Sequence, residues 1–287
     1  MQVTEDDLTL HVEEDGSTDA PPILLLHGIL GSHRTWNWLV PALSGRFWVL
    51  RLDFRGHGRS DRAPEAYLPA GYLADAVAVL EQVGQPALVI GHSLGGVTAA
   101  ALTQQRPDLV VAAIMEDPPL GPRTADEVPS LEGNSLLEAF RLMRQSIPQI
   151  QEADTSVDDL VGMLAAAPDT TGAGTFGEML HPDGVRAMAE SLLEVDATVL
   201  DRVLSGSMPV FLDPTRGFGA PSLIITADPS KPDAVAAPET AQHYADQSDD
   251  VEVVTISGAG HLIHDERASR QPFLDAVTAY LDRVAVS

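Results

Sequence analysis

Short apolar runs alternate with helical patterns through most of this 287-residue chain. The runs at 23–26 and 87–90 are apolar at every position, so strands formed from them must be covered on both faces. Buried strands separated by helices build a parallel sheet that lies between two helix layers, and the sequence therefore predicts an α/β fold. We expect strands at 8–12, 23–26, 48–52, 87–90, 112–115, 222–226 and 252–256, and helices at about 70–83, 94–106, 238–247 and 268–284.

The alternation stops between about residues 118 and 220, where several amphipathic stretches but no convincing strand occur. Apolar side chains fall at helical spacing around 136–144, 160–164 and 188–195. We interpret residues 118–220 as a helical cap, inserted into a core made of residues 1–117 and 221–287. Methionines are frequent in the cap segment, and their adaptable side chains suit the roof of a substrate pocket, for which Met143 and Met163 are candidates.

Composition excludes several classes of protein. The chain has 17 basic and 42 acidic residues, and a formal net charge of −25 opposes binding to nucleic acid or to an anionic membrane. The absence of cysteine excludes disulfides, thiolate metal sites and a cysteine nucleophile. The longest aliphatic run is far too short to span a bilayer, and the acidic start at 1–7 does not resemble a signal peptide. We expect a soluble, cytoplasmic protein whose partner is a small-molecule substrate.

Ser93 lies in the string Gly-His-Ser-Leu-Gly-Gly at 91–96, directly after one expected strand and directly before an expected helix. A serine at such a tight turn projects its hydroxyl out of the sheet, and small residues two positions away on either side let the backbone pass. The positive end of the following helix favours negative charge near that hydroxyl. This context predicts a nucleophilic serine.

A serine hydroxyl needs a base to accept its proton, and His261 is the best placed of the nine histidines. It ends the flexible sequence Ser-Gly-Ala-Gly-His, which follows the expected strand at 252–256. His264 is the rival base. A metal site made of His261, His264 and Asp265 is a weaker interpretation, because no His-Glu-x-x-His pattern and no further convincing ligand accompany them. We expect neither a metal nor a cofactor.

Four motifs of this chain resemble those of the α/β-hydrolase superfamily, and together they extend over nearly its whole length. They are His-Gly-Ile-Leu-Gly-Ser at 27–32, Asp-Phe-Arg-Gly-His-Gly-Arg-Ser-Asp at 53–61, the serine motif at 91–96 and Gly-Ala-Gly-His at 258–261. The resemblance implies that Ser93 is the nucleophile, that His261 is the general base, and that the backbone N–H groups of Ile29 and Leu94 form the oxyanion hole. It also implies an α/β-hydrolase fold with a cap after the sixth strand, where the helical insertion lies.

The acid that orients the histidine is harder to assign. Most relatives carry it in a Gly-x-x-Asp motif after the seventh strand, where this chain has a serine, so Asp228 or Asp233 would serve from a shifted position. Haloalkane dehalogenases and certain lactone hydrolases carry it after the sixth strand, where this chain offers Glu116 and Asp117. Neighbours on a strand face opposite sides, so only one of these two can reach the histidine. We favour Asp117 and keep Asp228 as the main alternative, with Glu116 and Asp233 behind it.

The serine also narrows the reaction, because haloalkane dehalogenases and epoxide hydrolases of this fold have an aspartate at its place. We expect an esterase or lactonase that acts on a medium-sized, largely apolar small molecule through an acyl-serine intermediate. Trp36 and Trp38, just past the expected oxyanion loop, are further candidates for the pocket. The alternatives are a hydrolase of carbon–carbon bonds in a ketone-bearing substrate, and a non-hydrolytic ligand receptor or lyase. The sequence leaves the substrate and the oligomeric state open.

Overall fold

An eight-stranded sheet forms the centre of the computed structural model, which describes residues 1–5, 7–121, 133–206 and 212–284. The strand order is β1-β2-β4-β3-β5-β6-β7-β8, and the pairing is parallel except between β1 and β2 and between β2 and β4. The strands are β1 (Gln2–Glu5), β2 (Leu8–Asp15), β3 (Pro22–Leu26), β4 (Trp48–Leu52), β5 (Ala87–His92), β6 (Val110–Glu116), β7 (Ser222–Thr226) and β8 (Val251–Thr255). The α/β prediction is confirmed.

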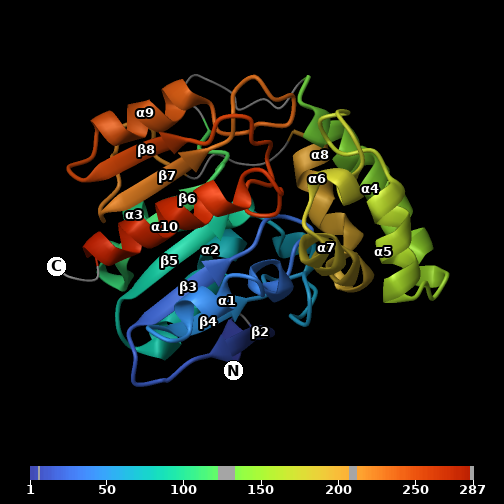
Figure 1. Ribbon diagram of the computed structural model, residues 1–287. Coiled ribbons are helices and arrows are strands. Elements are labelled where there is room, and N and C mark those ends of the chain that lie inside the picture. The colour runs from blue at the N-terminus through green and yellow to red at the C-terminus, as the bar shows by residue number, and fades with distance from the viewer. Residues whose placement is uncertain (6, 122–132, 207–211, 285–287) are drawn as a thin grey trace.

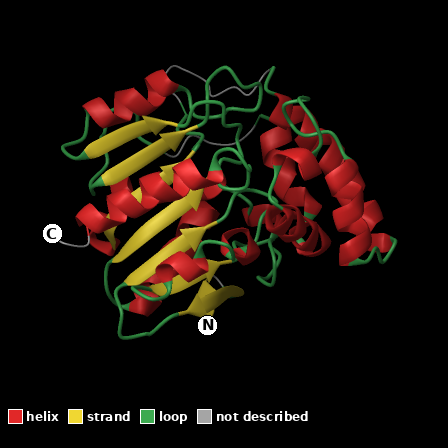
Figure 2. Ribbon diagram, viewed as in Figure 1, coloured by secondary structure: helices red, strands yellow, loops and turns green. Residues whose placement is uncertain are grey.

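Helices cover both faces of the sheet, as Figure 2 shows. The α-helices are α1 (Val40–Leu43), α2 (Pro69–Val83), α3 (Leu94–Gln105), α4 (Ser135–Glu152), α5 (Val157–Ala166), α6 (Phe176–Met179), α7 (Pro182–Glu194), α8 (Asp201–Leu204), α9 (Pro238–Asp246) and α10 (Arg270–Val284). The described residues also form the short 3-10 helices η1 (His33–Trp36), η2 (Pro64–Ala66), η3 (Pro107–Leu109) and η4 (Ala197–Leu200).

Two hydrophobic clusters hold the layers together. One joins α1 and α10 to one face of the sheet, and the other joins α2, α3 and α9 to the opposite face and continues into the cap. Small side chains at 99–101 are fully buried and let α3 pack closely against β5 and β6. The helix ends at Gln105, because Pro107 disfavours helical geometry in the residue before it.

Helices α4 to α8 come between β6 and β7 in the chain and lie together beyond one end of the sheet (Figure 1). Asn134 and Ser156 begin α4 and α5, because their side chains accept hydrogen bonds from backbone N–H groups of the first turn. The expected cap boundaries, 118 and 220, stay a prediction, and parts of that segment lie outside the described residues. Within the described ranges, no helix has both the length and the apolar character needed to cross a bilayer.

Candidate active site

The turn from β5 to α3 holds Ser93 in a strained conformation. Its φ of 52° and ψ of −111° lie in a region that residues with side chains rarely adopt. The turn is this tight only because glycines flank it: a Cβ on Gly91 would overlap the carbonyl oxygen of Gly95, and a Cβ on Gly95 would overlap that of Leu26. The carbonyl of Glu116 accepts a hydrogen bond from the Ser93 N–H at 2.8 Å and ties the turn to β6. The structure thus shows the strand–turn–helix context that a nucleophilic serine requires.

His261 and Ser93 line the same cavity. His261 follows β8 in the chain, is buried, and has its Nδ1 2.6 Å from Oδ2 of Asp117. An ionised carboxylate only accepts hydrogen bonds, so Nδ1 carries the proton and Nε2 keeps its lone pair. His92 fixes the backbone here, because its Nε2 lies 3.0 Å from the carbonyl oxygen of His261. The ring is therefore set in the tautomer that a general base needs.

Asp117 is held by three backbone N–H groups besides His261. It follows β6 directly, is fully buried, and has a positive φ of 39°. Its Oδ1 accepts from Ala227 and Ala236 at 3.2 and 3.0 Å, and its Oδ2 accepts from Val235 at 3.0 Å. Since these donors come from the segment after β7, the pairing of β6 with β7 positions the carboxylate.

The other candidate acids have different partners. Asp228 is partly exposed and accepts hydrogen bonds from Ser230 and Gly258, which lower its pKa to about 2 and close the loop after β7. Asp233 accepts from the backbone N–H of His261 at 3.3 Å, and not from its ring. Of the four carboxylates named from the sequence, the structure brings the Asp117 carboxylate to the His261 ring.

Glu116, the neighbour of Asp117, faces the other way and binds His264. Its carboxylate lies 2.8 Å from Nδ1 of His264 and also accepts the backbone N–H of that residue. Burial opposes a charge on this ring, but Glu116 and Asp265 outweigh burial and raise the pKa of His264 to about 10. His264 also lines the cavity. Since its ring is protonated at neutral pH, it has no lone pair with which to accept the serine proton.

The loop after β3 is fixed by two neutral histidines. His27 donates from Nδ1 to the carbonyl of Gly28 and accepts at Nε2 from the N–H of Phe54. His57 accepts at Nε2 from the N–H of Leu30, which has a positive φ of 67°. Burial lowers the pKa of His27 to about 4 and that of His57 to about 3, so both rings stay neutral. They hold the segment that contains Ile29, which lines the same cavity as Ser93.

The cavity has a volume of about 120 Å³ and is mostly apolar. Its apolar lining includes Ile29, Leu136, Phe140, Met143, Met188 and Leu192. The loop after β3 is joined to the cap on one side of this space, because the hydroxyls of Ser32 and Ser191 lie 2.8 Å apart. Helix α7 is further tied down by Glu194, which pairs with Arg34 at 2.6 Å.

Comparison with known proteins agrees with this arrangement. The profile of the Alpha/beta hydrolase family matches residues 23–272, a stretch that includes the serine turn, the carboxylate and the histidine. This chain belongs to the α/β-hydrolase family.

Similar members of the family come from a mammal and from bacteria. The chain is 27% identical, over 274 residues, to the sn-1-specific diacylglycerol lipase ABHD11 of Mus musculus, covering 93% of this chain and 83% of the relative. It is 26% identical, over 289 residues, to the 2-(acetamidomethylene)succinate hydrolase of Mesorhizobium japonicum, covering 96% and 92%. The structure of a thermophilic esterase from Thermogutta terrifontis matches with a TM-score of 0.68 and 20% identity, covering 99% and 98%. At that identity the structural match establishes the fold alone.

Of the pocket residues expected from the sequence of this hydrolase, only Met143 lines the cavity. Trp36 is fully buried, and its ring packs against the rings of His264 and Phe273. Trp38 packs toward α10, where the Arg270 guanidinium lies 4.7 Å from the centre of its ring. Met163 is 59% exposed, because α5 turns the neighbouring Leu160 and Leu164 inward instead. These three expectations were wrong, since spacing alone does not reveal which side of a short helix faces the site.

Several lining residues were not apparent from the sequence. Met188 and Leu192 belong to a helical pattern that the sequence did show, but the pattern does not say whether α7 faces the sheet, another cap helix or the cavity. Phe176 and Thr170 come from a stretch without periodicity, and no sequence signal points to them.

Proposed function

We propose that this α/β-hydrolase cleaves an ester or lactone of a largely apolar small molecule through an acyl-serine intermediate. The observation that carries the proposal is the serine on a strained turn whose cavity also receives His261, with Asp117 bound to the far side of that ring. The names of the similar proteins, a lipase, an esterase and a hydrolase, support hydrolytic chemistry.

In the proposed first step, the Ser93 hydroxyl oxygen attacks the substrate carbonyl carbon while Nε2 of His261 accepts the hydroxyl proton. The ring then carries a positive charge, and the Asp117 carboxylate stabilises that charge from Nδ1. The carbonyl oxygen becomes an oxyanion, which the backbone N–H groups of Ile29 and Leu94 stabilise. Two donors in a site that excludes water are worth several kcal/mol in the transition state.

The intermediate then collapses, the bond to the leaving oxygen breaks, and His261 returns its proton to that oxygen. The alcohol leaves and the acyl group stays on Ser93. A water molecule repeats the attack with His261 again acting as the base, and the acid product is released. Bond by bond, the reaction consumes one water and needs no oxidant, metal or cofactor.

The cavity limits the acyl group. An engineered protein cavity of about 150 Å³ accommodates benzene, so a space of this order accepts an acyl chain of about two to six carbons. The apolar lining favours hydrocarbon acyl groups, because a charged acyl group would lose its hydration on entering the cavity and gain few polar contacts in return. We therefore expect short-chain esters and small lactones to be better substrates than long-chain esters.

The proposal is tested with a series of p-nitrophenyl esters from acetate to decanoate, together with simple γ- and δ-lactones. The Ser93→Ala variant should lose turnover of every substrate that the wild type accepts. Ser230→Ala is the matched control, because that serine lies in the loop after β7, donates hydrogen bonds to Asp228 and does not line the cavity. Turnover that survives in Ser93→Ala would refute the proposal.

The same preparation separates the alternative functions. Cleavage of a dienyl diketone with little turnover of esters would indicate a carbon–carbon hydrolase that uses the same residues. Tight binding of a ligand without any turnover would indicate a receptor.

A further inference from the structure

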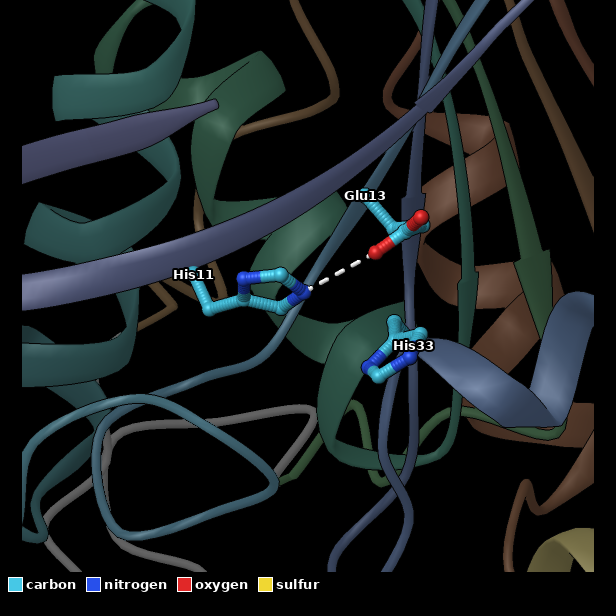
Figure 3. A group of neighbouring side chains, drawn as sticks. All are labelled: His11, Glu13 and His33. Atoms are coloured by element: carbon cyan, nitrogen blue, oxygen red, sulfur yellow. Dashed lines mark hydrogen bonds and ion pairs between the residues drawn. The ribbon is translucent and has the colours of Figure 1, made fainter.

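A second group of polar side chains, none of which lines the cavity, lies where β2 meets η1. His11 and Glu13 are two residues apart on β2 and so project from the same face of that strand. His33 begins η1, and its ring centre lies 5.1 Å from that of His11. Figure 3 shows the three side chains gathered around one space. One potential ligand atom from each lies within 4.8 Å of the other two.

His33 is held in the way that metal-binding histidines are held. Its Nδ1 donates to the carboxylate of Asp53, at 2.9 Å from Oδ2, and its backbone N–H donates to the same group at 2.6 Å. Asp53 is fully buried and also accepts from the N–H of Arg59. Because Nδ1 is occupied, Nε2 is the nitrogen that remains to bind a metal. A carboxylate behind the ring fixes both the tautomer and the orientation of such a ligand.

The potential ligand atoms of His11 and Glu13 are already separated by a distance that suits two ligands of one metal ion. Nε2 of His11 lies 3.2 Å from Oε2 of Glu13. In a tetrahedral zinc site with bonds of about 2.0–2.1 Å, neighbouring ligand atoms lie about 3.3 Å apart. The side chains of His11 and Glu13 are 17% and 40% exposed, so an ion reaches them from solvent and the third ligand is brought in by small side-chain movements.

Nearby groups do not block this site. Nη1 of Arg59 lies 3.7 Å from Oε2 of Glu13, and both side chains are about half exposed, which makes this pair weak and easily exchanged. The buried group of His92, Glu116 and His264 is less suited to a metal, because its carboxylate is not available. There the carboxylate is committed to His264, which carries a proton.

We propose that His11, Glu13 and His33 bind a divalent transition-metal ion, zinc foremost, with the remaining position open to water. Two imidazoles and one carboxylate are a donor set that zinc accepts. The ion would connect β2 to η1, the segment directly after the loop that carries Ile29. Its role would be to stabilise the fold at that loop, independently of the hydrolytic reaction. No pattern in the sequence indicates this site, because His33 reaches the strand through the pairing of β2 with β4 and the path of η1.

The proposal is tested by adding Zn²⁺ to the full-length, chelator-treated protein in competition with a fluorescent zinc indicator. The wild type should bind one equivalent, and His11→Gln and Glu13→Gln should each weaken that binding at least about tenfold. The matched control is His243→Gln, which removes a partly exposed histidine from α9. Co²⁺ should give visible absorption bands with the wild type and the control, and lose them in the two β2 variants.

Folding is checked separately, because a lost site must not be confused with a lost fold. Without metal, the two β2 variants should have the far-UV circular dichroism of the wild type, since both side chains are partly exposed. Zn²⁺ should then raise the melting temperature of the wild type and of His243→Gln, but not that of His11→Gln. Absence of stoichiometric binding, or equal binding by the wild type and both β2 variants, overturns the proposal.

Discussion

Replacing Asp117 by asparagine preserves the shape of the side chain but exchanges one acceptor oxygen for an NH₂ donor. If that NH₂ took the place of Oδ1, it would face two backbone donors, Ala227 and Ala236. In the place of Oδ2 it faces one backbone donor, Val235, and the ring of His261. The second orientation places the NH₂ group against one backbone donor instead of two. We therefore expect the NH₂ group to point at Nδ1 of His261.

This orientation reverses the tautomer of the base. Nδ1 must now accept a hydrogen bond, so the proton moves to Nε2, and the nitrogen proposed to accept the Ser93 proton loses its lone pair. The same exchange in a serine protease lowers kcat by about 10⁴ through the wrong tautomer. At about 1.4 kcal/mol for each factor of ten, this corresponds to about 5 kcal/mol of transition-state stabilisation. We predict a loss of this order in kcat for Asp117→Asn.

The assay compares kcat and kcat/KM of Asp117→Asn and Asp228→Asn on a short-chain aryl ester. Asp228→Asn should remain within a few-fold of the wild type, because its carboxylate accepts hydrogen bonds from Ser230 and Gly258 and not from the ring of His261. Thermal unfolding of both variants shows whether a loss of activity reflects a loss of folded protein. A kcat of Asp117→Asn within tenfold of the wild type, or equal losses in the two variants, would refute this reasoning.

Three further predictions follow from the packing and from the buried histidines. Gly95→Ala should destabilise the protein by about 3 kcal/mol, because its Cβ overlaps the carbonyl oxygen of Leu26, whereas Gly162→Ala, in an open helical position, should be neutral or stabilising in urea unfolding. Met143→Trp should narrow the cavity and so lower kcat/KM about tenfold for hexanoate esters and much less for acetate esters. Met163→Trp, on the exposed face of α5, should leave kcat/KM for both esters unchanged. The free energy of unfolding should peak near pH 6.5. Below this pH it should fall, because the unfolded chain protonates His27 and His57 while the native protein keeps them neutral. Above this pH it should fall as well, because native His264 keeps a proton, up to about pH 10, that the unfolded chain loses. Stability that rises between pH 7 and pH 9, or that is flat between pH 7 and pH 5, would contradict these assignments.

The core of the fold was predictable because its signals are local. Strands β3 and β5 are buried along their whole length, and the sequence shows this as unbroken apolar runs. The strand β1 was missed, since it alternates polar with apolar residues, pairs only with β2 and buries a single side chain, that of Val3. Edge strands of this kind carry little hydrophobic signal.

The site was predictable only as far as each part lies within one segment. Ser93 is marked by the glycines that its own turn requires. The choice between Asp117 and Asp228 depends on which strand end faces a loop more than 140 residues later in the chain, and neither order nor spacing encodes that. The cap shows the same limit, because the orientation of α5 and α7 relative to the end of the sheet decides which of their side chains reach the cavity.

The central claim is that the Ser93 hydroxyl becomes covalently acylated. Incubation of the protein with a fluorophosphonate probe, followed by intact-mass measurement and peptide mapping, tests it most directly. The account predicts one probe per chain, attached to Ser93, and no labelling of Ser93→Ala. An active ester hydrolase that the probe leaves unmodified, or a label on a different residue, would contradict it.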